Sequence, residues 1–325
     1  MQFVDTHCHI QEATASLEGD EFMRSKWHKA GKTDPDQLID DAKKAGVTKL
    51  LCVGTTLADS KLAVQLVQER TDCWATIGIH PHESEDHNSK DHLSQFEELA
   101  DKYGRPSYVD GVQGDNENRA SGIDNTASET RKKSTLQSAA STSSVASSVG
   151  RQAGTVRKVV AVGECGLDYY YNNSPKKHQI ELLEFQLNLA QKHELPLVFH
   201  VRDAFDEFLA ILSHFEGVRG VVHSFTANKA TLDKCLDRGL YIGLNGIMTF
   251  TKDEEQLAAA KAVPLDKLLL ETDAPFLTPT PYRGTICEPK HVRDVAEFLS
   301  SLRGEPLEQL AAATTQNAER LFNLN

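Results

Sequence analysis

Short apolar runs recur along the chain, and each is followed by polar residues and then by a segment with helical periodicity. The runs are rich in Val, Ile, Leu or aromatic residues and do not alternate with polar positions. Continuous runs of this kind are typical of parallel strands that are buried on both faces. The eight predicted strands are residues 3–7, 49–54, 73–79, 159–163, 197–200, 220–223, 241–244 and 268–271.

Apolar positions at helical spacing fill the stretches between these strands. The predicted helices are residues 35–45, 59–70, 91–102, 175–193, 204–214, 229–238 and 253–262. Eight strands that alternate with helices predict an α/β fold, a (β/α)8 TIM barrel. A last amphipathic segment, residues 306–322, is expected to pack as a helix against the base or side of the barrel.

One region interrupts this pattern between the third predicted helix and the fourth strand. Within it, residues 134–150 contain seven Ser and two Thr but no aromatic residue. Such a tract buries too little apolar surface to offset the entropy lost on ordering. We therefore predict a single barrel domain over residues 1–325 that is interrupted by a disordered, low-complexity insertion at residues 104–157.

The composition indicates which cellular compartment the protein occupies. The chain has no apolar run near the ~20 residues that a membrane span needs. Its first residues show no basic and then apolar pattern, so we do not expect a cleaved signal peptide. Its six cysteines lack paired spacing, which favours a reducing compartment, the cytoplasm or the nucleus, over secretion. The net charge of -12 argues against broad adhesion to nucleic acid but leaves phosphate chemistry open, because bound cations supply positive charge locally.

The end of the first strand carries the first candidate chemistry. His7 and His9 stand two residues apart, so a strand projects both imidazoles from one face. Two imidazoles on one face are a ready pair of metal ligands. An isolated pair of this kind is more often solvated or accidental, so the remaining strand ends decide between the two interpretations.

Further histidines and carboxylates follow other strands, and in a parallel barrel all of these positions meet at one rim. Each alone is more often a hydrogen-bonded core or rim residue. Together they are hard to explain as packing, because burying so many unpaired imidazoles and carboxylates is costly. Divalent cations such as Zn, Mn or Mg resolve that cost. The donors are His7, His9, Glu164, His200, His223 and Asp273, with His80 at the same rim.

The segments around these donors resemble a known family. They read V-D-T-H-C-H, G-I-H-P-H, V-G-E-C-G-L-D-Y-Y, F-H-V-R-D-A, V-V-H-S-F, L-E-T-D-A-P-F-L-T-P, Y-R-G and T-T-Q-N-A-E-R-L-F. In this order they look like the TatD family of metal-dependent deoxyribonucleases, within the amidohydrolase-like barrels. The resemblance implies two divalent metal ions, one on His7, His9 and Asp273 and one on His200 and His223, with Glu164 bridging.

The resemblance also implies an activity. It indicates a metal-dependent 3′–5′ exodeoxyribonuclease on single-stranded or frayed DNA, with a role in DNA repair or degradation. A hydroxide activated by two metals would attack the phosphorus, with Glu164 and Asp273 as catalytic residues. His80, Arg202 and Arg283 would bind substrate phosphate, against the alternative of rim hydrogen bonds or surface salt bridges.

Two other functions stay open. One is a small-molecule amidohydrolase or lactonase of the same superfamily. The presence of Glu164, where many such barrels carry a carbamylated Lys, favours the phosphodiesterase branch. The other is an inactive scaffold whose insertion binds a protein partner; the full set of six donors argues against it.

Several rim segments allow two interpretations. Residues 11–31 form either a lid or groove wall near the site or a loop that is stabilised by burying its apolar residues. Tyr169, Tyr170 and Tyr171 either stack an unpaired base or pack on the barrel. Glu271 is expected to orient a ligand. The polar stretch that holds His82, His87 and His92 predicts solvated imidazoles.

Overall fold

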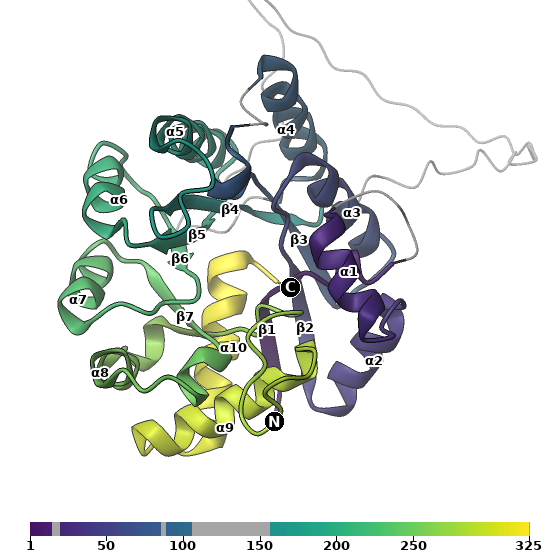
Figure 1. Ribbon diagram of the computed structural model, residues 1–325, viewed down its shortest axis with the longest axis vertical. Coiled ribbons are helices and arrows are strands. Elements are labelled where there is room, and N and C mark those ends of the chain that lie inside the picture. Colours follow the sequence, from purple (N-terminus) through teal and green to yellow (C-terminus); the bar gives the residue numbers. More distant parts are fainter. Residues whose placement is uncertain (15–19, 86–88, 106–156, 325) are drawn as a thin grey trace, which may run out of the picture. The chain divides into compact units, whose positions relative to one another are not determined.

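The computed structural model describes residues 1–14, 20–85, 89–105 and 157–324. Within these residues, eight parallel strands form one sheet in sequence order, and helices surround it, as Figure 1 shows in a view along the barrel. The strands are β1 (Phe3–Cys8), β2 (Val47–Cys52), β3 (Cys73–Ile77), β4 (Val159–Asp168), β5 (Leu197–Arg202), β6 (Gly220–Val222), β7 (Tyr241–Leu244) and β8 (Leu268–Leu270).

The sheet closes between β1 and the segment that follows β8. The Asp273 amide donates to the His7 carbonyl over 2.8 Å, and the His9 amide donates to the Ala274 carbonyl over 2.8 Å. All eight predicted strands are present and the TIM barrel is confirmed. The predicted end of β4 was too early: the strand continues past Glu164 to Asp168.

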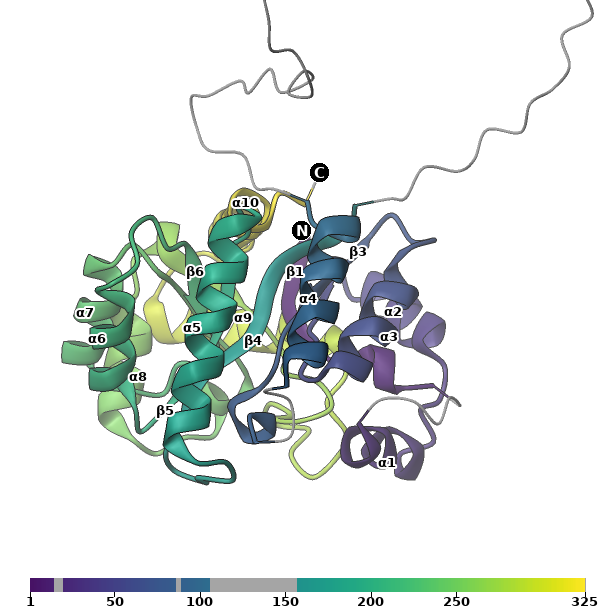
Figure 2. The same ribbon diagram turned by 90° about the horizontal axis from the view of Figure 1, so that it is seen from above.

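The helices of the described residues surround the barrel and close one of its ends (Figure 2). They are α1 (Glu21–Lys29), α2 (Pro35–Lys44), α3 (Leu57–Val67), α4 (Lys90–Tyr103), α5 (Lys176–Lys192), α6 (Phe205–Leu212), α7 (Lys229–Asp237), α8 (Glu254–Ala262), α9 (Val292–Arg303) and α10 (Leu307–Phe322). The sequence pattern predicted all of them except α1 and α9.

The barrel interior is a packed apolar core. Val4, Leu51 and Trp74 from three strands belong to a buried cluster that also contains Leu321 and Phe322 of α10. This helix therefore closes the barrel end that lies opposite α1 (Figure 2), as its amphipathic pattern predicted. A second cluster packs the outer faces of the strands against the surrounding helices.

The unpredicted helix α1 is fixed to the strand end that carries the histidine pair. Asp20 caps it by accepting a hydrogen bond from the Met23 amide. Trp27 is fully buried, and its indole N–H donates to the His9 carbonyl over 3.1 Å. Phe22, one residue before Met23, is 62% exposed. The segment thus both packs and presents one aromatic side chain at the surface.

The predicted insertion leaves and re-enters the barrel at one place. Gly104 forms a parallel bridge with Val159, and the Arg157 guanidinium donates to the Gly104 carbonyl over 2.9 Å. Residues 106–156 lie outside the described part of the chain, so the predicted disorder and the predicted domain boundaries stay predictions.

All six cysteines are free and buried. In the described part of the chain, no helix combines the length and the apolar character that crossing a membrane requires.

Candidate metal centre

The histidine pair at the end of β1 forms one side of the site. His7 and His9 are buried, and their Nε2 atoms lie 3.3 Å apart. The Nδ1 atom of His9 lies 2.8 Å from the carbonyl oxygen of Val53, which only accepts hydrogen bonds. Nδ1 of His9 therefore carries a proton, and Nε2 of the same ring points into the site. Oδ1 of Asp273 lies 3.7 Å from His7 Nε2 and 3.5 Å from His9 Nε2.

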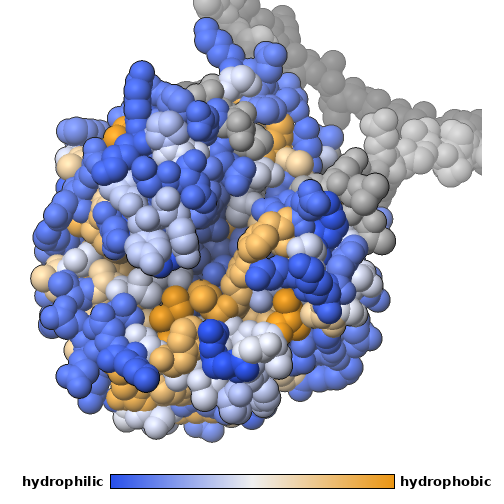
Figure 3. Space-filling model, viewed as in Figure 1, coloured by the Kyte–Doolittle hydropathy of each residue, from blue (hydrophilic) through white to orange (hydrophobic). Residues whose placement is uncertain are grey.

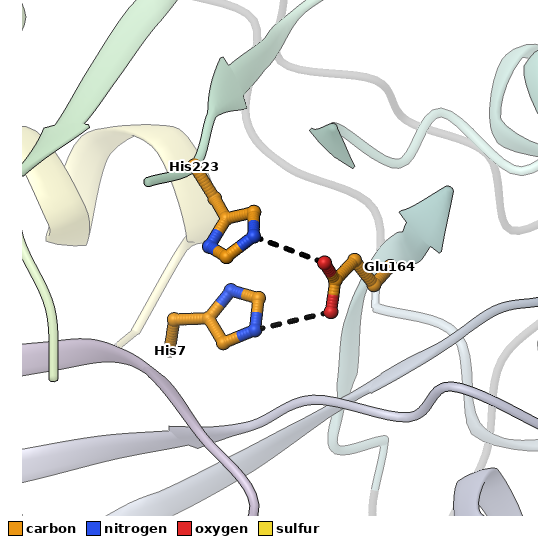
Figure 4. A group of neighbouring side chains, drawn as sticks. All are labelled: His7, Glu164 and His223. Atoms are coloured by element: carbon orange, nitrogen blue, oxygen red, sulfur yellow. Dashed lines mark ion pairs between the residues drawn. The ribbon is translucent and has the colours of Figure 1, made fainter. Parts of the chain in front are cut away.

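Glu164 lies at the centre of the cluster. Its Oε2 is 3.3 Å from His7 Nε2, and its Oε1 is 3.0 Å from His223 Nε2, an arrangement drawn in Figure 4. Its Oε1 also lies 3.0 Å from His200 Nδ1. Burial opposes ionisation, but the surrounding histidines hold the pKa of Glu164 well below its usual range. The carboxylate is therefore a permanent negative charge between the two halves of the site.

Close packing of β4 and β5 brings Glu164 to His200. Gly163 and Gly166 flank the glutamate region with φ values of 144° and 149°, which side chains rarely adopt. A Cβ at Gly166 would collide with the carbonyl oxygen of His200, and one at Gly163 would lie 2.5 Å from the carbonyl oxygen of Val198. Both glycines of the V-G-E-C-G motif are thus needed for the strands to approach.

Partners on the outer side orient the other two histidines. His200 Nε2 lies 2.9 Å from Oδ2 of Asp168, and His223 Nδ1 lies 3.4 Å from Oε1 of Glu271. On the inner side, His200 Nδ1 and His223 Nε2 lie 3.4 Å apart, and each lies 3.0 Å from Oε1 of Glu164. Two imidazole nitrogens and a carboxylate oxygen that converge in a buried site are the arrangement that a bound cation would stabilise. The donor set therefore fits divalent metal ions that prefer nitrogen and oxygen ligands.

The structure brings together every predicted ligand. The described residues contain three groups whose donor atoms lie within 4.8 Å of one another: His7–His9–Asp273, His7–Glu164–His223 and His80–Glu164–His200. Glu271 has the orienting position that the sequence predicted for it, next to His223. The number and identity of the ions stay predictions.

His80 faces the same cluster but points a protonated ring nitrogen into it. Its Nδ1 accepts a hydrogen bond from the His82 amide, so its proton is on Nε2, which lies 3.5 Å from Oε1 of Glu164. Burial lowers the pKa of His80 well below its usual value, which keeps the ring neutral. His80 is thus arranged as a hydrogen-bond donor into the site, as expected of a residue that binds an anion.

The two predicted arginines lie in different places. Arg202 lines the cavity that contains the histidines and stacks on Tyr170, with 4.0 Å between its guanidinium carbon and the ring centre. Arg283 does not line this cavity. Its guanidinium stacks on Phe250 and donates to the Thr278 carbonyl, beside a neighbouring trough.

Two residues of the site were missed in the sequence. Asp168 is fully buried and contacts both His200 and His82, whose Nε2 lies 3.0 Å from Oδ2 of Asp168. The prediction that His82 is solvated is therefore wrong. The sequence contained a signal for Asp168, which stands four residues after Glu164. If the strand continues past Glu164, both side chains lie on the same face. Of the same stretch, His87 lies outside the described residues.

The cluster opens into a cavity of about 620 Å³ at the end of the barrel where α1 lies. Figure 3 shows a hollow at this end with hydrophobic residues along part of its rim. The apolar and aromatic lining residues are Phe22, Met23, Tyr171, Ile247, Phe276 and Leu277.

Known proteins share much of this sequence. The family model of the TatD related DNases matches residues 4–110 and 136–323. The chain belongs to the TatD family. The Bacillus subtilis uncharacterized metal-dependent hydrolase YabD is 31% identical over 295 residues, which cover 90% of this chain and 94% of YabD. The 3′-5′ ssDNA/RNA exonuclease TatD of Citrobacter rodentium is 32% identical over 301 residues, which cover 90% and 92% of the two chains.

The fold of this TatD family member also matches solved structures. The crystal structure of the TatD homolog YJJV of Escherichia coli superposes with a TM-score of 0.73 at 25% identity, covering 99% of this chain and 98% of that chain. The family assignment and the fold are thereby confirmed. The chain is a metal-dependent hydrolase of the TatD family.

Proposed function

We propose that this chain is a divalent-metal-dependent deoxyribonuclease that removes nucleotides from the 3′ end of single-stranded or frayed DNA. The observation that carries the proposal is the set of imidazole nitrogens of His9, His200 and His223 that converge with the carboxylates of Glu164 and Asp273. The name of the Citrobacter rodentium relative supports single-stranded nucleic acid as the substrate.

In this proposal the two halves of the cluster hold separate ions. His7, His9 and Asp273 would hold one and His200 and His223 the other, with Glu164 between them. Divalent cations bound there would supply Lewis-acid activation of water and positive charge for the phosphodiester.

Asp273 is the better placed carboxylate for proton transfer. Its side chain is 17% exposed, whereas that of Glu164 is 5% exposed. An attacking water that enters from the cavity therefore reaches Asp273 Oδ1, which we assign as the proton acceptor. His80 Nε2–H and the Arg202 guanidinium then donate to the phosphate oxygens.

The expected cellular role follows from the activity. An exonuclease of this kind would act in DNA repair or DNA degradation, in the cytoplasm or the nucleus, where six free cysteines stay reduced. Binding of a protein partner by the predicted insertion stays a hypothesis, because residues 106–156 lie outside the described part of the chain.

Cleavage of end-labelled oligonucleotides tests the proposal. Chelated protein would be supplied with Mg, Mn or Zn and a 5′-labelled single strand, with RNA, a blunt duplex and a 3′-phosphorothioate strand as comparisons. We expect stepwise shortening of the unmodified single strand that depends on added metal and stops at the 3′ phosphorothioate. Hydrolysis of lactones or cyclic amides without any shortening of DNA would instead support the small-molecule hydrolase.

Asp168 gives a prediction about how the site is oriented. Replacing Asp168 by Asn removes the charge that holds the proton of His200 on Nε2, so we expect metal affinity and kcat to fall about 10-fold to 100-fold. Metal titration and steady-state kinetics measure both. Asp206→Asn is the matched control, since that side chain is 93% exposed and pairs only with Lys234 among the described residues. Equal activity of the two variants would contradict this positioning role.

Arg202 gives a second prediction, about substrate binding. Removing its charge-assisted hydrogen bonds in Arg202→Ala should raise KM for single-stranded DNA about 10-fold to 100-fold. Lys at this position should restore only part of the loss, because an ammonium lacks the planar fork. Arg293→Ala is the control, as Arg293 is exposed on α9 and pairs with Glu297. An unchanged KM in Arg202→Ala would remove Arg202 from the substrate site.

A further inference from the structure

Two grooves adjoin the metal cavity, and they differ in charge. The first has a volume of about 560 Å³, shares Arg202 with the cavity and runs beside Tyr170. Three of its lining residues are the carboxylates Asp203, Asp206 and Glu207. A polynucleotide with one negative charge per phosphate is repelled there.

The second groove, the basic trough, has a volume of about 730 Å³. It shares Phe276 and Leu277 with the metal cavity, so the two are continuous. Its charged lining residues among those described are Lys26, Lys29 and Arg283, and none is acidic. No carboxylate of the described residues lies within ion-pair distance of these three groups, although the chain as a whole carries a net charge of -12. This local positive charge suits a phosphate backbone.

An aromatic pair stands between the metal cavity and the basic trough. Phe22 of α1 stacks on Phe276, with ring centres 6.0 Å apart and an interplanar angle of 18°. The ammonium of Lys26 lies 4.9 Å from the centre of the Phe22 ring and 5.7 Å from that of Phe276. Burial does not explain this arrangement, since Phe22 keeps 62% of its surface exposed while its neighbours Met23 and Trp27 are buried.

Resting on the proposed function, we propose that a single strand leaves the metal cavity over Phe22 and Phe276 and continues along the basic trough. A base near the 3′ end stacks on the exposed face of Phe22, and the backbone phosphates that follow pair with Lys26, Lys29 and Arg283. The contacts use ring faces and phosphates, so they are independent of sequence. The acidic groove beside Tyr170 stays free of the strand.

The test compares a substrate that spans only the metal cavity with one that reaches the trough. The small diester is bis(p-nitrophenyl) phosphate, and the strands are oligothymidylates of two to ten nucleotides. Phe22→Ala should raise KM for the longer strands by about 5-fold to 100-fold more than it raises KM for the small diester. Phe22→Trp should lower that KM. Since Phe22 is largely exposed, neither change removes core packing.

The role of the lysine charges in the basic trough is tested through the salt dependence of KM. For the ten-nucleotide strand, Lys26→Ala should reduce the slope of log KM against log salt by about 0.7, and Lys26→Ala with Lys29→Ala by about twice that. Lys44→Ala is the control, because Lys44 is exposed on α2 and pairs with Asp41 away from the trough.

The outcomes separate this inference from the function on which it rests. A wild-type enzyme that shortens oligothymidylate, combined with unchanged KM and salt slope in the Phe22 and Lys26 variants, overturns the strand path alone. A wild-type enzyme that cleaves the small diester but no oligothymidylate overturns both. A larger rise in KM for the long strands than for the small diester, with a smaller salt slope, establishes the path.

Discussion

Replacing Glu164 by Gln should lower DNA cleavage by at least about 1000-fold while the barrel stays folded. Among the described residues, Glu164 is the single carboxylate that contacts histidines from both halves of the cluster, at 3.0 Å from His200 and His223 and 3.3 Å from His7. Gln has the same shape but no charge, so it fills the same space without holding cations between the two halves. Single-turnover cleavage of a 5′-labelled oligonucleotide measures the loss.

A matched control separates loss of chemistry from loss of structure. Glu181→Gln makes the same chemical change at a half-exposed position on α5, where Glu181 pairs only with Lys177 among the described residues. It should behave as wild type, and the two variants should share one circular dichroism spectrum. Glu164→Gln protein that retains a tenth or more of the activity would contradict the central role of this carboxylate.

Removal of metal should have the second large effect, on both activity and stability. The chelated protein should be inactive, because no cation would activate water or neutralise the phosphodiester. It should also be less stable, because the buried carboxylates of Glu164 and Asp273 would lose a cation that they ligate. Adding a divalent ion at 100 times its Kd contributes about 2.7 kcal/mol to the free energy of unfolding. For a domain of this size, that corresponds to a rise in Tm of about 4–5 °C.

Thermal melts with and without metal check this prediction. The His7→Ala variant serves as comparison, since it removes a ligand from two of the clusters and should show a much smaller metal-dependent rise in Tm. Wild-type protein whose Tm and activity are both unaffected by prolonged chelation would show that the cluster works without a metal ion.

The strand ends were predictable because the barrel leaves little choice. Continuous apolar runs specify buried parallel strands, and parallel strands in a barrel all end at one rim. His7, His200 and His223 therefore had to meet once the strands were located. Helix α10 was predictable from its amphipathic pattern, because its apolar positions are the ones that pack beneath the barrel.

Asp168 and His82 were missed for a physical reason. β4 is buried along its whole length, so no alternation of polar and apolar residues shows where it ends, and the two glycines of V-G-E-C-G resemble a strand terminus. His82 lies in a short turn after β3 among polar residues, and only the tertiary contact with Asp168 distinguishes it from a solvated side chain.

Helix α1 was missed although its signals are present. Asp20 is a favourable N-cap, and Met23 and Trp27 have the spacing of one helical face. Exposed residues of both charges surround these two, so the apolar stripe is too narrow to stand out in the sequence. That Phe22 would face the metal cavity depends on how the helix packs against the end of β1.

Anomalous X-ray diffraction from crystals grown with Mn or Zn shows whether metal ions bind beside Glu164, because it locates the ions without reference to any substrate. We expect two peaks there, one ligated by His7, His9 and Asp273 and the other by His200 and His223. A peak elsewhere in the barrel, or none within bonding distance of Glu164 in crystals that bind the metal, would contradict this expectation.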